Sequence, residues 1–242
     1  MSLDKISTDL ARAGRALAAA GLVNAFGHVS AREPDAAALF ITPPEPLGRL
    51  GDDSVFQRIP LEGGTLPQGV PKEAWIHRAV AVARPDVGGI CRAQPFYATA
   101  AAVAGIPIRP LHGQGALLGG ITPVFEEPRL VRDPETASAL AGTLGPAHSL
   151  VMRGNGAITV GRTVGEAVAR MWVLEESARL ALATASATVS TAPPTPLTSP
   201  ERHAWEAAGT ELLDRIWNHL TSVSDSPPAL AAGPATPKEY AL

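Results

Sequence analysis

The sequence predicts an α/β protein of three layers, in which a sheet lies between two layers of helices. Segments with apolar residues three or four positions apart, as in half-buried helices, alternate with short apolar runs typical of strands. Glycine or proline separates most of these segments. The 242 residues are enough to enclose a sizeable core in one domain. Alternation of this kind typically places helices on both faces of one sheet.

In the first half of the chain, capping and helix-breaking residues set the expected boundaries. Leu10 and Leu17 lie on one face of a first helix that Gly21 can end. Pro71 suits the first position of a second helix, because its missing N–H needs no partner there. Pro85 ends that helix, since proline disfavours helical dihedral angles at the preceding residue. The expected elements are a helix ending near 21, strands around 29, at 39–41 and at 55–59, a helix over 71–84, a strand over 90–94 and a helix over 95–105.

In the second half, two helix starts are explicit. Asp133 followed by Pro134 is an N-cap with proline in the first helical position, and it predicts a helix through Leu144. Thr163 and Glu166 have the spacing of a capping box in front of a long helix to about residue 185. Between these helices, strands are expected at 150–152 and 157–160, on either side of a Gly-Asn-Gly turn.

The composition changes after the long helix, where proline, serine and threonine replace the periodic apolar residues. A last helix follows, with Trp205, Leu212 and Ile216 on one face, and then a stretch rich in proline and small residues. The expected division is a folded domain over 1–185, a linker over 186–199, a C-terminal helix over 200–221 and a flexible tail over 222–242.

Composition and charge exclude several classes of protein. A net charge of −3 gives no basic surface for nucleic acid or an anionic membrane. No apolar run reaches the roughly 18 residues of a membrane span, and the first residues do not resemble a signal peptide. Cys91 is alone, so no intrachain disulfide can form and a reducing compartment is expected. The sequence therefore predicts a cytoplasmic protein with no nucleic-acid or membrane partner.

Five motifs in order resemble the class II aldolase and adducin family. They are GHVSAR at 27–32, ITP at 41–43, Glu73-x-x-Ile-His followed by RPDV at 84–87, MRGNG at 152–156 and the helix over 163–175. In the order and spacing of its segments, the resemblance extends over residues 5–185. The resemblance implies a three-layer α/β/α class II aldolase-like fold with a central, mainly antiparallel sheet. A narrower resemblance, in segments 108–112 and 123–126, is to hydroxy-aromatic-acid decarboxylases.

The resemblance also implies a divalent metal held by three histidines, but this chain lacks them. The corresponding positions are Arg92, Gln94 and Asn155. A guanidinium stays protonated and has no lone pair to donate, and it repels a cation. The neutral carbonyl oxygens of Gln94 and Asn155 are poor ligands for zinc or iron. The sequence therefore predicts that the family's metal site is lost and that no cofactor is used.

The matched motifs place a set of polar residues in the expected cleft. We expect Glu73 to act as general acid or base, Arg92 to clamp an anion, and His112 or His28 to carry a second proton. Part of the family's phosphate-binding set is replaced by proline, so a carboxylated or aromatic small molecule is favoured over a sugar phosphate. The catalytic candidates are Glu73, Arg92 and His112, and the substrate-binding candidates are His28, Ser30, Thr42, Gln94 and Asn155.

The favoured hypothesis is a metal-independent enzyme that acts on such a molecule by proton transfer or C–C bond chemistry, and two other hypotheses remain open. In the first, Arg92 merely neutralises Glu73 in an inactive remnant, leaving a non-catalytic scaffold or binding protein such as the adducin head domain. In the second, a relocated metal uses His28, His77 or His112. A pocket left open and polar would favour the metal-independent enzyme, and one filled by Arg92 would favour the scaffold. The resemblance further implies a homo-oligomer, a tetramer with the cleft at the subunit interface.

Overall fold

The structure is a computed structural model that describes residues 3–34, 37–51, 53–187 and 194–225. The predicted linker therefore lies partly, and the predicted tail mostly, outside the described residues. Among the described helices, none combines the length and apolar character that a membrane span requires.

A seven-stranded sheet forms the middle layer, in the order β3-β2-β1-β4-β7-β6-β5. Every neighbouring pair is antiparallel except β5 and β6, which are parallel. This confirms the mainly antiparallel sheet. The strands are β1 (His28–Arg32), β2 (Ala38–Ile41), β3 (Gln57–Pro60), β4 (Gly89–Ala93), β5 (Val124–Phe125), β6 (Ser149–Met152) and β7 (Ala157–Gly161).

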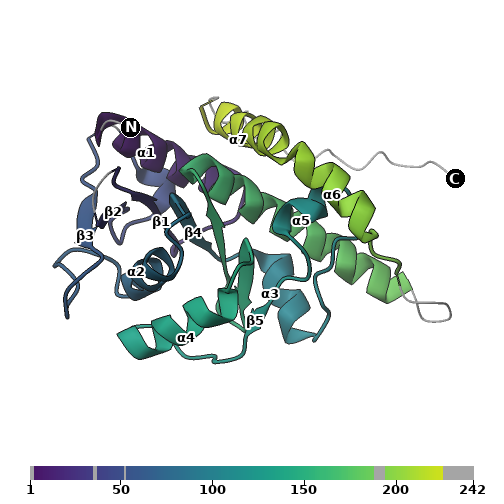
Figure 1. Ribbon diagram of the computed structural model, residues 1–242. Helices are drawn as coiled ribbons and strands as arrows, with labels where there is room; N and C mark the ends of the chain where they lie inside the picture. The colour runs from purple at the N-terminus through teal and green to yellow at the C-terminus, as the bar shows by residue number, and fades with distance from the viewer. Residues whose placement is uncertain (1–2, 35–36, 52, 188–193, 226–242) are drawn as a thin grey trace, which may run out of the picture.

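Helices cover both faces of the sheet, as expected from the alternating pattern (Figure 1). The core on one face is built with α1 (Leu3–Ala19), α3 (Phe96–Val103) and α5 (Val164–Ala187), and α7 (Gly209–Asp225) packs on α1 and α5. The core on the other face is built with α2 (Ala74–Ala83) and α4 (Pro134–Leu144). Two short 3₁₀ helices, η1 (Leu47–Arg49) and η2 (Gln114–Leu118), lie in the connections.

Strand alternation decides which side chains of the central strand β4 meet α2. Ile90 belongs to the core under α2 and α4, whereas Cys91 belongs to the core under α1 and α5. Arg92, two residues after Ile90, therefore faces α2. Cys91 is fully buried, and burial raises the pKa of its thiol to about 12, so it is a small core residue.

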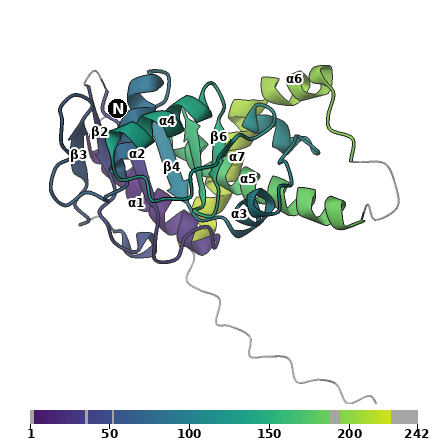
Figure 2. The same ribbon diagram turned by 90° about the horizontal axis from the view of Figure 1, so that it is seen from below.

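Two helices differ clearly from the sequence expectation, and the strand expected at 55–59 begins only at Gln57. The helix predicted over 200–221 is two helices, α6 (Ser199–Ala207) and α7 (Gly209–Asp225), because the chain leaves helical geometry at Ala208 in front of a glycine. Figure 2 shows α6 at one end of the molecule, away from β2 and β3. The second helix begins at Ala74 instead of Pro71, since residues 71–73 form a turn closed by the Ala74 N–H on the Pro71 carbonyl.

Candidate active site

The register of the two central strands places two of the predicted site residues side by side. His28 on β1 lies directly opposite Arg92 on β4. Glu73 is the N-cap residue of α2, which crosses this face of the sheet, and Asn155 lies in the turn between β6 and β7. Residues distant in the sequence thus meet where β1 and β4 pass beneath the N-terminal end of α2.

Arg92 is the centre of this cluster and is only 1% exposed. Its Nη2 lies 3.1 Å from Glu73 Oε2 and donates to the Asn155 side-chain oxygen at 2.9 Å and to the Asn155 carbonyl at 3.2 Å. The Asn155 amide in turn donates to Glu73 Oε1 at 3.3 Å. Three predicted site residues therefore form one hydrogen-bonded triangle.

The triangle uses only one nitrogen of the guanidinium. Arg92 Nε and Nη1 are buried and have no hydrogen-bond partner among the described residues, and the same holds for His28 Nε2. A cavity of about 240 Å³ adjoins these groups. Its lining residues are Ala25, Phe26, Gly27, His28, Pro44, Glu45, Pro71, Lys72, Glu73, Arg92 and Arg132. Arg92 therefore lines an open, polar pocket instead of filling it.

Behind His28 lies a second buried chain of polar groups. His28 Nδ1 is 2.6 Å from His77 Nε2, and His77 Nδ1 is 2.7 Å from Ser30 Oγ. His28 Nε2 lies 3.8 Å from Glu73 Oε2, beyond hydrogen-bond length. The sequence motifs left the role of His77 open. Its position one helical turn after Glu73 was the only indication that it faces the site.

The electrostatics of the pocket set the protonation states of its groups. Burial acts to raise the pKa of Glu73, but His28, Arg92 and the Asn155 amide together hold it below its usual value. Burial lowers the pKa of His28 and, more strongly, of His77, and Arg92 lowers both further. At neutral pH the pocket therefore holds a Glu73 carboxylate, two neutral imidazoles and the Arg92 guanidinium.

Three predicted site residues lie outside this cluster. His112 Nε2 is 3.0 Å from Ser177 Oγ on α5, away from the pocket lining. Thr42 is fully buried, and its hydroxyl oxygen accepts the Val29 N–H. Gln94 is exposed, because β4 ends at Ala93 and the strand alternation that would have aligned it with Arg92 ends there too. Within this chain, none of the three lines the pocket.

The residues present do not fit the family's metal. Of the residues at the three histidine positions, Arg92 is already paired with Glu73 and Gln94 is exposed. The Asn155 side chain is hydrogen-bonded to both Arg92 and Glu73. The two histidines that do lie here direct ring nitrogens at each other. In the part of the chain that the structure describes, no three His, Cys, Asp or Glu residues are grouped to hold a metal ion.

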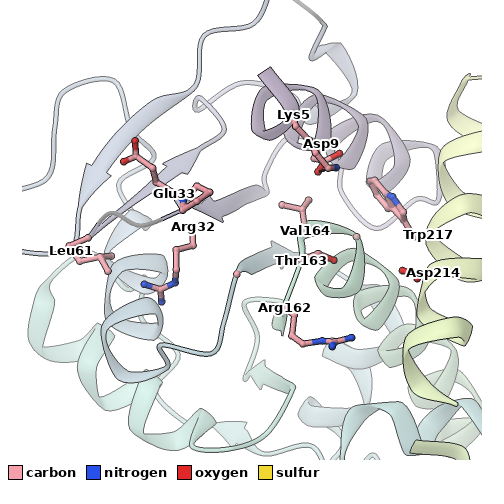
Figure 3. Close-up of a pocket in the computed structure, with 14 residues that line it drawn as sticks. Lys5, Asp9, Arg32, Glu33, Leu61, Arg162, Thr163, Val164, Asp214 and Trp217 are labelled. Atoms are coloured by element: carbon pink, nitrogen blue, oxygen red, sulfur yellow. Dashed lines mark hydrogen bonds and ion pairs between the residues drawn. The ribbon is translucent and has the colours of Figure 1, made fainter. Parts of the chain in front are cut away.

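A larger cavity, of about 740 Å³, lies elsewhere, between the start of α5, α1, α7 and the far end of β1 (Figure 3). Its cationic groups are engaged: Arg32 donates to the backbone carbonyls of Ala81, Arg84 and Val87, and Arg162 is paired with Glu166. None of the predicted site residues lines it. The smaller pocket at Arg92 is therefore the candidate active site.

Comparison with known proteins agrees with this fold. The family model described as Class II Aldolase and Adducin N-terminal domain matches residues 8–182. A 3,4-dihydroxyphthalate decarboxylase of Rhodococcus jostii (strain RHA1) is 31% identical over 194 residues, which cover 74% of this chain and 79% of that protein. The enzyme of the same name from Terrabacter sp. (strain DBF63) is 32% identical, with 74% and 80% covered.

Solved structures show the same architecture. An L-fuculose 1-phosphate aldolase from Glaciozyma antarctica PI12 superimposes with a TM-score of 0.74 at 20% identity and covers 91% of this chain and 90% of its own. The L-fuculose-1-phosphate aldolase of Thermus thermophilus has a TM-score of 0.68 at 27% identity, with 78% and 98% covered. The family predicted from the motifs is thus confirmed, and this chain belongs to the class II aldolase and adducin family.

Proposed function

We propose that this protein is a decarboxylase-like lyase that acts on a small hydroxylated aromatic acid without a bound metal. One observation carries the proposal: Arg92 lines a pocket beside the Glu73 carboxylate, and two of its buried guanidinium nitrogens have no partner among the described residues. The relatives named 3,4-dihydroxyphthalate decarboxylase support the reaction class and the kind of substrate.

The size and charge of the pocket suit such a substrate. A cavity of about 150 Å³ holds benzene, so about 240 Å³ admits one substituted ring. Among the lining residues, Lys72, Arg92 and Arg132 are cations, against the carboxylates of Glu45 and Glu73. Three cations against two carboxylates leave one positive charge in excess. An anionic aromatic acid is therefore favoured over a neutral ring.

Arg92 supplies the anchor for the substrate carboxylate. A buried guanidinium with two free N–H groups can hold a carboxylate by charge-assisted hydrogen bonds. Because Glu73 and Asn155 fix its third nitrogen, the side chain is already oriented before substrate binds. Preorganised donors of this kind stabilise charge that develops in a transition state without having to reorient.

Glu73 is the group that moves the proton. As a carboxylate it can take the proton of a substrate ring hydroxyl, and the resulting phenoxide makes the carboxylated ring carbon more basic. Glu73 then returns the proton to that carbon. The carbon–carboxylate bond breaks, its electron pair stays in the ring, and carbon dioxide leaves. The product departs as a phenoxide and takes up one proton from water.

The assembly proposed for the protein is a homotetramer in the cytoplasm, with the pocket near a subunit interface. Apolar side chains left exposed on the single chain support an assembly: Phe96 and Val103 on α3 are 72% and 67% exposed, and Phe26 at the pocket is 67% exposed. Closed symmetric assemblies are the usual way in which such surfaces are covered.

The proposal is tested by incubating the purified protein with 3,4-dihydroxyphthalate in the presence of a chelator and following carbon dioxide release. We expect turnover that the chelator does not abolish and that Glu73→Gln does abolish. Binding of the acid without turnover, measured by calorimetry, would instead support the non-catalytic binding protein. Turnover that disappears with the chelator and returns with a divalent metal would contradict metal independence.

A further inference from the structure

A buried polar chain that the proposed reaction does not yet use reaches the pocket at His28. Ser30 and His77 are fully buried, and His28 is 4% exposed. Their side chains form one line of hydrogen bonds, from Ser30 through His77 to His28, which ends at the pocket with the unpartnered His28 Nε2. A buried polar chain that opens at one end into a pocket points to a role in binding.

The direction of this chain follows from its two ends. Each neutral imidazole has one N–H and one nitrogen without hydrogen, so placing the hydrogen on one ring nitrogen fixes the donor and acceptor of every other contact in the chain. If Ser30 donates to His77 Nδ1, then His77 Nε2–H donates to His28 Nδ1, and His28 carries its hydrogen on Nε2.

The opposite direction leaves two groups unsatisfied. The Ser30 hydroxyl hydrogen would have no acceptor among the described residues. His28 Nε2, without a hydrogen, would face the Glu73 carboxylate at 3.8 Å, and its lone pair would be repelled by the negative charge. Both costs vanish when Ser30 is the donor.

We propose that Ser30 and His77 hold His28 as its Nε2–H tautomer, and that this N–H donates to the anionic substrate beside Arg92. The chemical identity of that anion rests on the proposed function. His28 then touches the substrate and is a catalytic residue, whereas Ser30 and His77 are positioning residues. The two strands β1 and β4 present the two donors, His28 Nε2–H and the free edge of Arg92, from directly opposite positions.

The surroundings keep His28 neutral, so it acts as a fixed donor and does not exchange its proton. The groups that face it are Glu73 and His77 from α2 and Arg92 from β4, and Glu45, Lys72 and Arg132 also line the pocket. Burial and Arg92 lower the pKa of His28, and Glu73 offsets this only in part. A neutral imidazole is a suitable donor to a developing oxyanion because it provides an N–H without a mobile charge.

The tautomer is tested directly by NMR on protein labelled with ¹⁵N at histidine, without substrate. We expect both His28 and His77 to be neutral with the hydrogen on Nε2, and to stay so from about pH 5.5 to 8, where an ordinary histidine titrates. The spectra of His28→Gln and His77→Gln assign the two rings. A hydrogen on His28 Nδ1, or titration of His28 with an ordinary pKa, would overturn the proposal.

Donation to an anion is tested with phthalate, which lacks the ring hydroxyls that the reaction needs. Adding phthalate should shift the His28 Nε2 resonance and leave the tautomer unchanged. Failure of phthalate to bind, or binding without a shift, would refute the inference. The protein could bind phthalate with the expected shift and yet not turn over 3,4-dihydroxyphthalate. That result would support this inference and contradict the proposed function.

Kinetics separate a positioning role from a structural one. His28→Leu should lower kcat by roughly 10²-fold, the effect of losing one preorganised donor, and His28→Gln should keep part of the activity because its amide can donate. Ser30→Ala should lower kcat about tenfold and mix the tautomers, because its donor no longer fixes them, while Ser30→Thr should restore both.

Ser149→Ala is the matched control, since Ser149 is also fully buried on a strand and shares a 3.0 Å hydroxyl contact with Thr122 outside the pocket. It should leave kcat unchanged. Wild-type kcat and an unmixed tautomer in Ser30→Ala would show that Ser30 does not set the polarity of the chain.

Discussion

Replacing Arg92 with alanine is the change that most directly separates an active pocket from an inactive remnant. The 3.1 Å separation from Glu73 corresponds to about 5 kcal/mol of attraction at an effective dielectric constant of about 20. A substrate carboxylate on the free edge of the guanidinium would gain a similar attraction, most of which desolvation offsets. We expect a loss of about 2–4 kcal/mol of transition-state stabilisation, or roughly 30- to 1,000-fold in kcat/KM.

The same substitution will also destabilise the fold, and this effect must be separated from catalysis. Without Arg92 the Glu73 carboxylate, whose side chain is 13% exposed, loses its cation, which costs about 3–5 kcal/mol in comparable buried pairs. Combining Arg92→Ala with Glu73→Gln should recover much of that stability without recovering activity. Arg170→Ala is the matched control, because Arg170 is a similarly buried arginine paired with Glu166 on α5, away from the pocket.

The assay is kcat/KM on 3,4-dihydroxyphthalate, corrected for the folded fraction measured by urea unfolding. Arg92→Lys should recover only part of the activity, since an ammonium lacks the planar pair of donors. Arg170→Ala should lower stability but leave the corrected kcat/KM unchanged. If Arg92→Ala stays within about threefold of the wild type after correction, Arg92 is a structural group and the non-catalytic interpretation holds.

Three further predictions use other features of the chain. Protein purified without chelator should contain no stoichiometric zinc, iron or manganese by elemental analysis, whereas combining Arg92→His, Gln94→His and Asn155→His should create metal binding. Light scattering at micromolar concentration should give about four times the mass of one chain, and a monomer would contradict the tetramer. Burial lowers the pKa of His148 to about 4, and Arg170 and Arg84 contribute to this shift. Between about pH 6.5 and 4 the unfolded chain therefore binds more protons than the folded one. Stability should therefore fall on acidification through that window, by roughly 1–2 kcal/mol because solvent screens the partly exposed ring, and His148→Asn should flatten the dependence seen in urea unfolding.

Local sequence rules predicted most of the elements because their determinants lie within a few residues of each other. The Asp133 cap begins α4, with Pro134 in the first helical position, as expected, and its side chain accepts the Thr136 N–H. The break at Ala208 was missed, since α6 and α7 have the apolar periodicity of a single helix. What separates them is a turn at a residue that carries no strong helix-breaking side chain.

The site was only partly predictable, for a reason of the same kind. Glu73, Arg92 and Asn155 were identified because each lies in a local motif, and the structure joins them through short contacts. The His28–His77 contact depends on where a helix crosses a strand 49 residues away in sequence, which no local pattern records. Gln94 was misplaced by extending strand alternation one residue beyond Ala93, where the strand ends.

The unpaired donors of the pocket bear on whether it is a remnant or a working site. A buried polar group without a partner costs roughly 1–3 kcal/mol, so a pocket that had lost its ligand would be expected to close over its polar atoms or satisfy them internally. Here Arg92 Nε, Arg92 Nη1 and His28 Nε2 have no partner among the described residues around one cavity, although Glu73 and Asn155 already satisfy the other end of the guanidinium. Because Arg92 and His28 lie opposite each other and line one cavity, a common acceptor in that cavity is the simplest explanation of their unpartnered donors. An anion that bridges Arg92 and His28 would satisfy all three at once, which is why the pocket is better explained as a site that receives a carboxylate than as a neutralised remnant of a metal centre.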